Sequence, residues 1–159
     1  MGARAESLAK QYETKAAEMT ATINKLSDAD WKKTTTAEKW SVGVTAHHVA
    51  GGHEPIAGIA RTIASGQSIP NFTMAALDEM NAKHAKDFAG CTKAETLALH
   101  QKGVVAAAAV VRGLSDAELD RSGTVLSGMP AMTAQQVVEN ILINHIDSHM
   151  GSIRKTVGA

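Results

Sequence analysis

Two histidines near the C-terminus, His145 and His149, have a spacing that suggests metal chemistry. Residues four apart on an α-helix project from the same side, one turn above the other. A single divalent ion can therefore bind both imidazoles, as it does in other helical pairs with this spacing. Two ligands rarely hold a metal, so the pair requires a third ligand from another part of the chain.

We predict that His48 is this third ligand. On a helical wheel at about 100° per residue, His48 lies near the apolar face of its segment, whereas His47 lies roughly 160° away and should face solvent. His145 and His149 fall within the apolar stripe of the last segment. Small residues after His48, at positions 50–52, should leave room beside the site. The apolar positions that define the two faces are Val49, Gly52, Ile56, Ile59 and Ile63, and Ala134, Val137, Val138, Ile141 and Leu142.

Three imidazoles leave coordination positions open, which is typical of catalytic rather than structural metal sites. A metal bound there lowers the pKa of a bound water or thiol and so generates a nucleophile at neutral pH. The donor set suits zinc, nickel, copper or iron. The alternative interpretation is that each ring is a neutral core histidine that bonds to a backbone carbonyl or a water.

The composition predicts one helical domain over residues 1–159. Apolar residues make up 44% of the chain but aromatic residues only 3%, and alanine is abundant. This composition favours closely packed helices over a β-sheet. The formal net charge is zero, so nothing favours a nucleic acid or an anionic membrane as partner. A charged N-terminal segment without signal-peptide character and the single Cys91 lead us to expect a cytoplasmic protein.

Periodicity and capping signals predict helices over residues 4–26, 41–65, 73–90, 92–114 and 133–157, with a short helical turn at 115–118. Ser41 and Thr92 are expected N-caps, and a turn is expected at residues 27–30. The predicted fold is an all-α four-helix bundle with one additional short helix.

Two motifs resemble those of the DinB-like superfamily. Trp40-Ser41-Val42, with His48 eight positions after the tryptophan, resembles the first motif. The segment from His145 to Ile153, which contains the HxxxH pair, resembles the second. Each motif is common in isolation, but their order and separation together are specific, and the similarity spans essentially the whole chain.

The resemblance implies an up-up-down-down bundle in which His48, His145 and His149 bind a divalent metal, often zinc or nickel. Characterised relatives include thiol-dependent transferases and isomerases that use mycothiol, bacillithiol or related low-molecular-weight thiols. We therefore expect a small-molecule substrate and activation of such a thiol. Bundles of this kind frequently pair, which leads us to expect a homodimer.

Other residues offer weaker candidates for catalysis. His53 is a candidate acid or base at the edge of the pocket, although partial exposure as a bystander is the alternative. His100 is expected on a helix surface, and Cys91 is expected to have a modestly lowered pKa at a helix start. Two other functions stay open: a hydrolase that uses metal-bound hydroxide, and a non-catalytic, stress-related metal-binding bundle.

Overall fold

Helices account for most of the chain. The computed structural model describes residues 2–158, and four long helical segments form its framework. They are α1 (Ala3–Lys25), α3 (Val42–Ala64), α5 (Lys93–Arg112) and a C-terminal segment of α7 (Ala134–Val137), the π-helical turn η1 (Val138–Ile143) and α8 (Asn144–Val157). The smaller elements are α2 (Asp28–Lys32), α4 (Met74–Asp87), α6 (Asp116–Leu119), β1 (Ser122–Gly123) and β2 (Met132–Thr133).

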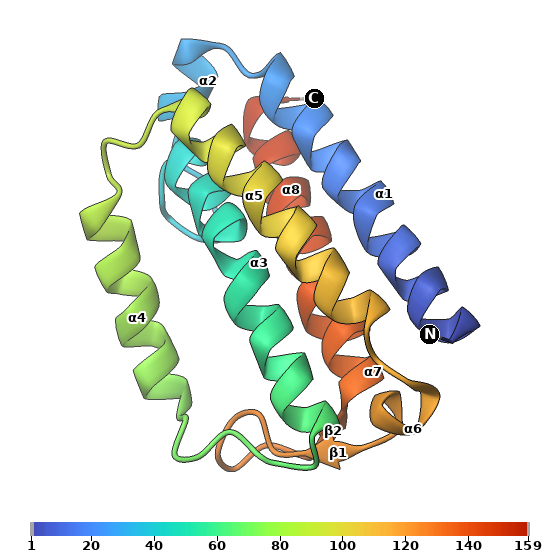
Figure 1. The fold of residues 1–159 in the computed structure, drawn as a ribbon. Coiled ribbons are helices and arrows are strands. Elements are labelled where there is room, and N and C mark those ends of the chain that lie inside the picture. Colours follow the sequence, from blue (N-terminus) through green and yellow to red (C-terminus); the bar gives the residue numbers. More distant parts are fainter. Residues whose placement is uncertain (1, 159) are drawn as a thin grey trace.

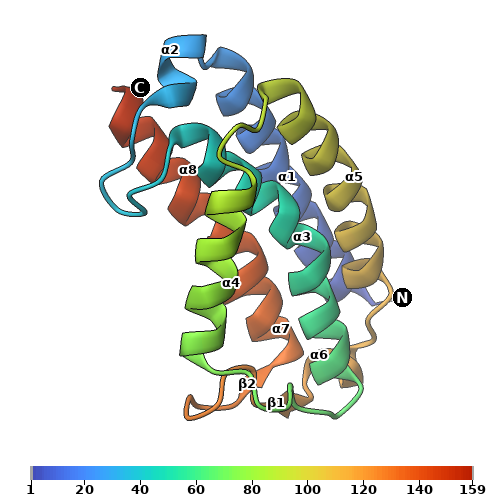
Figure 2. The same ribbon diagram turned by 90° about the vertical axis from the view of Figure 1, so that its left-hand side faces the viewer.

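The four long segments pack side by side, which confirms the predicted all-α four-helix bundle (Figures 1 and 2). In Figure 1, α1 and the C-terminal segment run upward, whereas α3 and α5 run downward. Two helices thus point each way, but along the chain they run up, down, down, up rather than up-up-down-down. The order follows from α4, which returns the chain to the top along the flank of the bundle, so that α5 runs parallel to α3.

Side-chain caps fix where the helices begin. At the start of α3, Ser41 Oγ accepts a hydrogen bond from the Val44 amide at 3.0 Å, as expected for an N-cap. Thr92 and Thr133 form reciprocal capping boxes with the residues three positions later. Ser27 forms the same box and starts α2, where the sequence led us to expect a stop and turn. These caps place His48 in the second turn of α3.

Small side chains allow α3 and α5 to pack closely. A Cβ at Gly103 of α5 would lie only 3.1 Å from Cβ of His53 on α3. The alanines along these two helices that are at most 2% exposed are Ala46, Ala50, Ala57, Ala60, Ala64, Ala107 and Ala108. The abundance of alanine thus reflects close helix packing, which holds α3 rigidly beside the core.

Helix α4 lies outside this core. None of its residues is buried, and it meets α3 through the rings of His84 and Phe88, which pack against His47. A helix without buried apolar residues contributes little to the stability of the bundle. It does cover one side of the first half of α3, where His48 lies.

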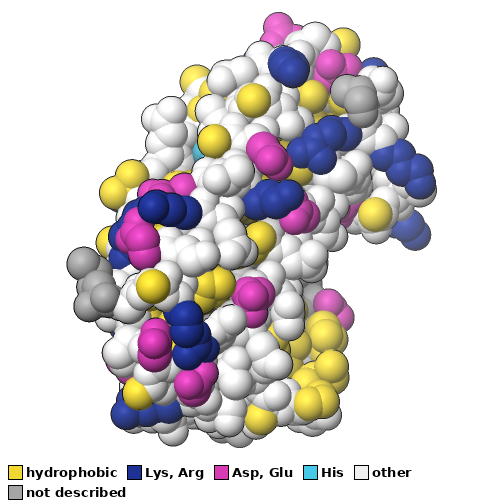
Figure 3. All heavy atoms as spheres, turned by 90° about the vertical axis from the view of Figure 1, so that its right-hand side faces the viewer, with side chains coloured by type: hydrophobic (Ala, Val, Ile, Leu, Met, Phe, Trp, Pro, Cys, Tyr) yellow, Lys and Arg dark blue, Asp and Glu magenta, His cyan; other side chains and the backbone are white. Residues whose placement is uncertain are grey.

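The face of the molecule that carries α1 shows basic and acidic side chains interspersed rather than gathered by sign (Figure 3). Arg112 of α5 joins two carboxylates of α1, with Nε 2.9 Å from Glu6 Oε2 and Nη1 3.0 Å from Glu13 Oε2. Among residues 2–158, no helix combines the length and the apolar character needed to cross a membrane.

Candidate metal centre

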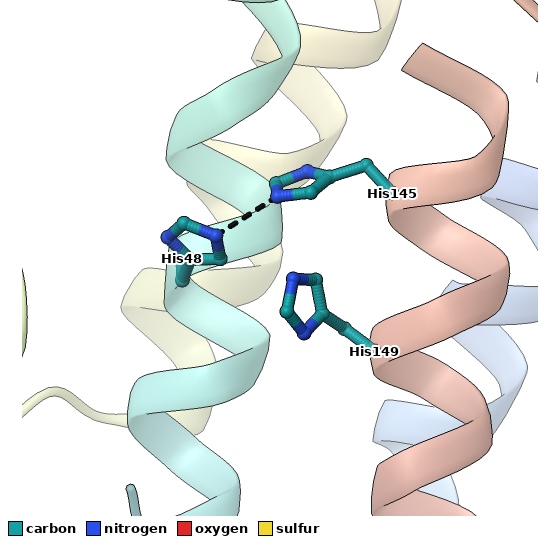
Figure 4. A group of neighbouring side chains, drawn as sticks. All are labelled: His48, His145 and His149. Carbon is teal, nitrogen blue, oxygen red and sulfur yellow. Dashed lines mark hydrogen bonds between the residues drawn. The ribbon is translucent and has the colours of Figure 1, made fainter. Parts of the chain in front are cut away.

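Three histidine rings from two helices converge (Figure 4). His48 projects from α3, and His145 and His149 project from the first two turns of α8. The Nε2 atoms of His48 and His145 are 2.8 Å apart. One ligand nitrogen from each of the three rings lies within 4.8 Å of the other two. The structure thus brings together the three residues that the sequence predicted as metal ligands.

The π-helical turn η1 immediately precedes Asn144 and His145 and sets the register of the last helix. Such turns contain an extra residue and are frequent at functional sites. Before the turn, Ala134 and Val137 are buried; after it, Ile146 and Met150 are buried. His145 directly precedes Ile146, and His149 directly precedes Met150. Both histidines are half-buried, beside these two core residues. The last helix can therefore bury its core residues and still direct both rings toward α3.

Gly52 provides the space for the ring of His145. It lies one turn after His48 on α3, and a Cβ at this position would lie 3.0 Å from Cε1 and 3.3 Å from Nδ1 of His145. The room that the sequence predicted beside His48 is therefore occupied, at Gly52, by the ring of another candidate ligand. A side chain at position 52 would displace that ring.

Burial favours the neutral form of the His48 and His145 imidazoles. Burial, and after it the neighbouring rings of His149 and His84, lowers the pKa of His48 to about 4. Burial, and after it His48 and His149, also lowers the pKa of His145. Neutral imidazoles offer nitrogen lone pairs, which suit divalent transition metals. Nitrogens that bind one ion at about 2.0–2.1 Å lie roughly 3–4 Å apart. The 2.8 Å separation of His48 and His145 and the 4.8 Å limit for all three rings lie on either side of this range, so small shifts of the rings would accommodate an ion.

The loop before α3 supplies two further neighbours of the rings. Trp40 contacts His48 edge to face, with ring centroids 5.1 Å apart. Glu38 Oε2 lies 2.7 Å from Nδ1 of His149, and Ser152 Oγ lies 2.6 Å from Glu38 Oε1. Burial opposes ionisation of Glu38, but its hydrogen bonds, of which those from Ser152 and His149 have the largest effect, together outweigh burial and lower the pKa of Glu38. Glu38 was not among the residues predicted from the sequence, where its one signal is its position two residues before the tryptophan of the first motif.

A second histidine pair lies beside the three rings. His47 was predicted to face solvent, but this is wrong: it is only 6% exposed. The reason is α4, because Phe88 stacks on the His47 ring at a centroid distance of 4.2 Å and His84 Nε2 lies 2.8 Å from His47 Nδ1. The Nδ1 atom of His84 is buried, although the residue as a whole is not, and it has no hydrogen-bond partner within residues 2–158. The ring centroid of His84 is 5.7 Å from that of His48. The surroundings of the site therefore include an imidazole with unused hydrogen-bonding capacity.

The structure places His53 in a different environment, between α3, α1 and α5. Its Nδ1 is 2.7 Å from Tyr12 Oη, and its Nε2 is 2.9 Å from Nδ1 of His100. His100 Nε2 in turn bonds to the Ala16 carbonyl at 3.0 Å. That carbonyl can only accept, so His100 Nε2 carries its hydrogen, His53 donates from Nε2, and Tyr12 donates to His53. The ring nitrogens of His53 and His100 are thus all bonded in a fixed order.

This Tyr12–His53–His100 chain corrects two expectations about exposure. Both histidines are 1% exposed, whereas His53 was expected at a pocket edge or partly exposed, and His100 on a helix surface. Burial, and after it the His100 ring, lowers the pKa of His53 to about 3, and burial lowers the pKa of His100. Helical wheels could not show this arrangement, because α1 covers a face of α5 that looks polar in the sequence.

The prediction that the pKa of Cys91 is lowered is wrong. Burial is the largest influence on this thiol and raises its pKa. The Cys91 carbonyl accepts a hydrogen bond from Trp31 Nε1 at 3.0 Å. The segment around Cys91 therefore packs against the corner formed by α2, as a structural contact.

Comparisons with known proteins agree with this arrangement. Residues 12–142 match the family described as mycothiol maleylpyruvate isomerase N-terminal domain. No curated protein sequence matches the chain. Among solved structures, YfiT from Bacillus subtilis, described as a probable metal-dependent hydrolase with an unusual four-helix bundle topology, is similar with a TM-score of 0.75 and 16% identity over 99% of this chain and 90% of its own.

A mycothiol-dependent maleylpyruvate isomerase is similar with a TM-score of 0.73 and 13% identity over 96% of this chain. The chain spans 63% of the length of that isomerase. Identities this low establish a shared fold, whereas the family match covers most of the chain. The protein therefore belongs to the mycothiol maleylpyruvate isomerase N-terminal domain family, within the DinB-like superfamily.

Proposed function

We propose that this protein is a divalent-metal-dependent enzyme that activates a low-molecular-weight thiol for reaction with a small electrophile. His48, His145 and His149 are the proposed ligands, and zinc and nickel are the proposed metals. The observation that carries the proposal is the convergence of three ring nitrogens, from two helices, within 4.8 Å of one another. Membership of a family that takes its name from a mycothiol-dependent isomerase supports the choice of a thiol.

Each residue around the site has a distinct part in this proposal. A bound divalent metal would act as a Lewis acid and lower the pKa of a thiol or water beside it. The three histidines provide the nitrogen lone pairs, and Gly52 gives the ring of His145 its place. Trp40 covers one edge of His48 and limits the entry of water. The catalytic role predicted for His53 stays a prediction, and the bonds of both its ring nitrogens favour an indirect role.

A hydrolase, with water as the nucleophile, is the second candidate. It is favoured by the similarity to YfiT, which covers 90% of that protein. The two candidates share the same histidines and differ in the nucleophile. A set of small electrophiles, assayed with and without added mycothiol, bacillithiol or glutathione, distinguishes them. The proposal predicts turnover that requires the thiol, whereas turnover in water without thiol favours the hydrolase.

Elemental analysis of the untagged protein tests the metal site itself. We expect about one divalent metal ion per chain in the wild type and a large loss in His48→Ala and His149→Ala. His84→Gln is the matched control, because it changes a neighbouring histidine outside the group of three and should retain the metal. A wild type with no more metal than the two alanine variants would contradict the proposal. Metal uptake without turnover in any assay would favour the non-catalytic binding protein.

A further inference from the structure

The loop between α2 and α3 brings a carboxylate to the outer side of the candidate metal centre. Glu38 lies in this loop, and its side chain is only 9% exposed. Resting on the metal site proposed above, we propose that Glu38 is a positioning residue, which fixes the tautomer and the direction of the His149 ring so that Nε2 faces the ion. Glu38 touches neither the ion nor the substrate in this proposal; it acts through His149.

The hydrogen bond between Glu38 and His149 determines where the imidazole carries its hydrogen. An ionised carboxylate only accepts, so His149 Nδ1 must donate across the 2.7 Å contact. In the neutral ring Nε2 then has no hydrogen and offers a lone pair. Figure 4 shows the ring of His149 directed between His48 and His145. Without Glu38, neutral imidazole can place its hydrogen on either nitrogen, and the tautomer with Nε2–H cannot bind a metal through that atom.

Glu38 is itself held in position by contacts on both sides. Ser152, three residues after His149 on the same face of α8, donates to the other carboxylate oxygen at 2.6 Å. The loop is closed at its base by an isolated bridge between Thr34 and Ser41 and by the bond from the Thr35 amide to the Trp40 carbonyl at 2.8 Å. The backbone turns tightly within it, since Lys39 has a φ of 62°. These contacts make Glu38 a rigid partner for His149.

The same loop contacts ligands on both helices. Glu38 bonds to His149 of α8, and Trp40, two residues later, packs against His48 of α3. Carboxylates that accept from a metal-binding histidine also raise the basicity of its other nitrogen. The loop therefore contacts two of the three proposed ligands. A substitution of Glu38 should lower the metal affinity more strongly than it lowers the stability of the fold.

Two measurements test this role in the full-length protein. The affinity for Zn²⁺, and separately for Ni²⁺, is measured by competition with a chromogenic chelator. The tautomer of His149 is read in the metal-free protein from side-chain ¹H–¹⁵N NMR correlations. The variants are Glu38→Ala, Glu38→Gln, which keeps an acceptor oxygen but removes the charge, and Ser152→Ala. Glu79→Gln, an exposed glutamate of α4, is the matched control.

We expect His149 in the wild type to carry its hydrogen on Nδ1, and Glu38→Ala to weaken metal binding by about 10–100-fold and shift the tautomer toward Nε2–H. Glu38→Gln and Ser152→Ala should fall between wild type and Glu38→Ala, with Glu79→Gln equal to wild type. An affinity of Glu38→Ala within twofold of wild type, or an unchanged tautomer, would overturn the proposal. If Glu38→Ala does not fold, the same comparison with Glu38→Gln decides. A wild type that binds neither metal refutes the proposed function, whereas the tautomer of metal-free His149 still tests Glu38.

Discussion

Two groups of histidines in this bundle differ in what their ring nitrogens contact. In the Tyr12–His53–His100 chain, the ring nitrogens all have partners and the direction of each bond is fixed. In the other group, His48, His145 and His149 direct nitrogens toward one another. The remaining nitrogen of His149, Nδ1, is hydrogen-bonded to Glu38. Burial near an apolar core is therefore common to both groups. What separates a structural histidine from a candidate ligand is whether its ring nitrogens bond to other kinds of protein partner in a fixed order or converge with the nitrogens of two other rings.

Removing one of the three candidate ligands should have the largest effect on metal binding. His145→Ala is expected to weaken metal binding by more than the roughly 100-fold that the loss of an outer hydrogen-bond partner costs. The metal-free protein should keep its helical content, because the ring is only half-buried. Metal titration together with circular dichroism checks both expectations. An unchanged affinity would mean that His145 is a core residue of the same kind as His100.

Substitutions in the buried Tyr12–His53–His100 chain should instead lower stability and leave metal binding unchanged. His53→Ala and His100→Ala each remove a ring that is 1% exposed and leave a buried polar partner unsatisfied. We expect a loss of about 2–4 kcal/mol in the free energy of unfolding, measured with urea. Metal content should stay close to that of the wild type. If His53→Ala instead keeps its stability and loses turnover, the catalytic role predicted for His53 gains support.

The pH dependence of stability provides a further contrast. Burial holds the pKa of His53 at about 3, below its usual value of about 6.5 in the unfolded chain. The unfolded state then binds more protons than the folded state below pH 6.5. Stability is therefore complete above about pH 6.5 and falls as the pH drops toward 3, by up to about 1.4 kcal/mol per pH unit for this group. Urea unfolding of metal-free protein at several pH values should show a shallower slope in His53→Phe than in the wild type. Equal slopes in the two proteins would contradict the lowered pKa of His53.

A smaller effect is expected at the glycine beneath the ring of His145. Gly52→Ala places a Cβ 3.0 Å from that ring, so metal affinity should fall by about tenfold as the ligand shifts. Stability should change by less than about 1 kcal/mol, because alanine favours the helix. Gly58→Ala is the matched control on the same helix, since its Cβ would meet nothing within 4 Å. Equal affinities in both variants would show that Gly52 does not shape the site.

The three candidate ligands could be predicted from the sequence because local geometry decides them. A spacing of four places His145 and His149 on one side of a helix, and the apolar stripes indicate the side that faces inward. The helix starts could be predicted for the same reason, since a cap such as Ser41 acts within four residues.

The remaining features depend on contacts between segments that are distant in sequence. Burial of His47 requires α4, and burial of His100 requires α1, and neither neighbour is visible on the wheel of a single helix. Glu38 meets His149 across 111 positions, so no local pattern in the sequence indicates that pair. The π-helical turn before His145 also escapes a wheel that assumes a constant 100° per residue.

The three-histidine site can be tested by locating zinc crystallographically, from anomalous diffraction of crystals of protein loaded with one equivalent of Zn²⁺. We expect one strong peak between α3 and α8, with nitrogens of His48, His145 and His149 at about 2.0–2.1 Å. A peak elsewhere, for example between His47 and His84, or coordination by fewer than two of these three rings, would contradict it.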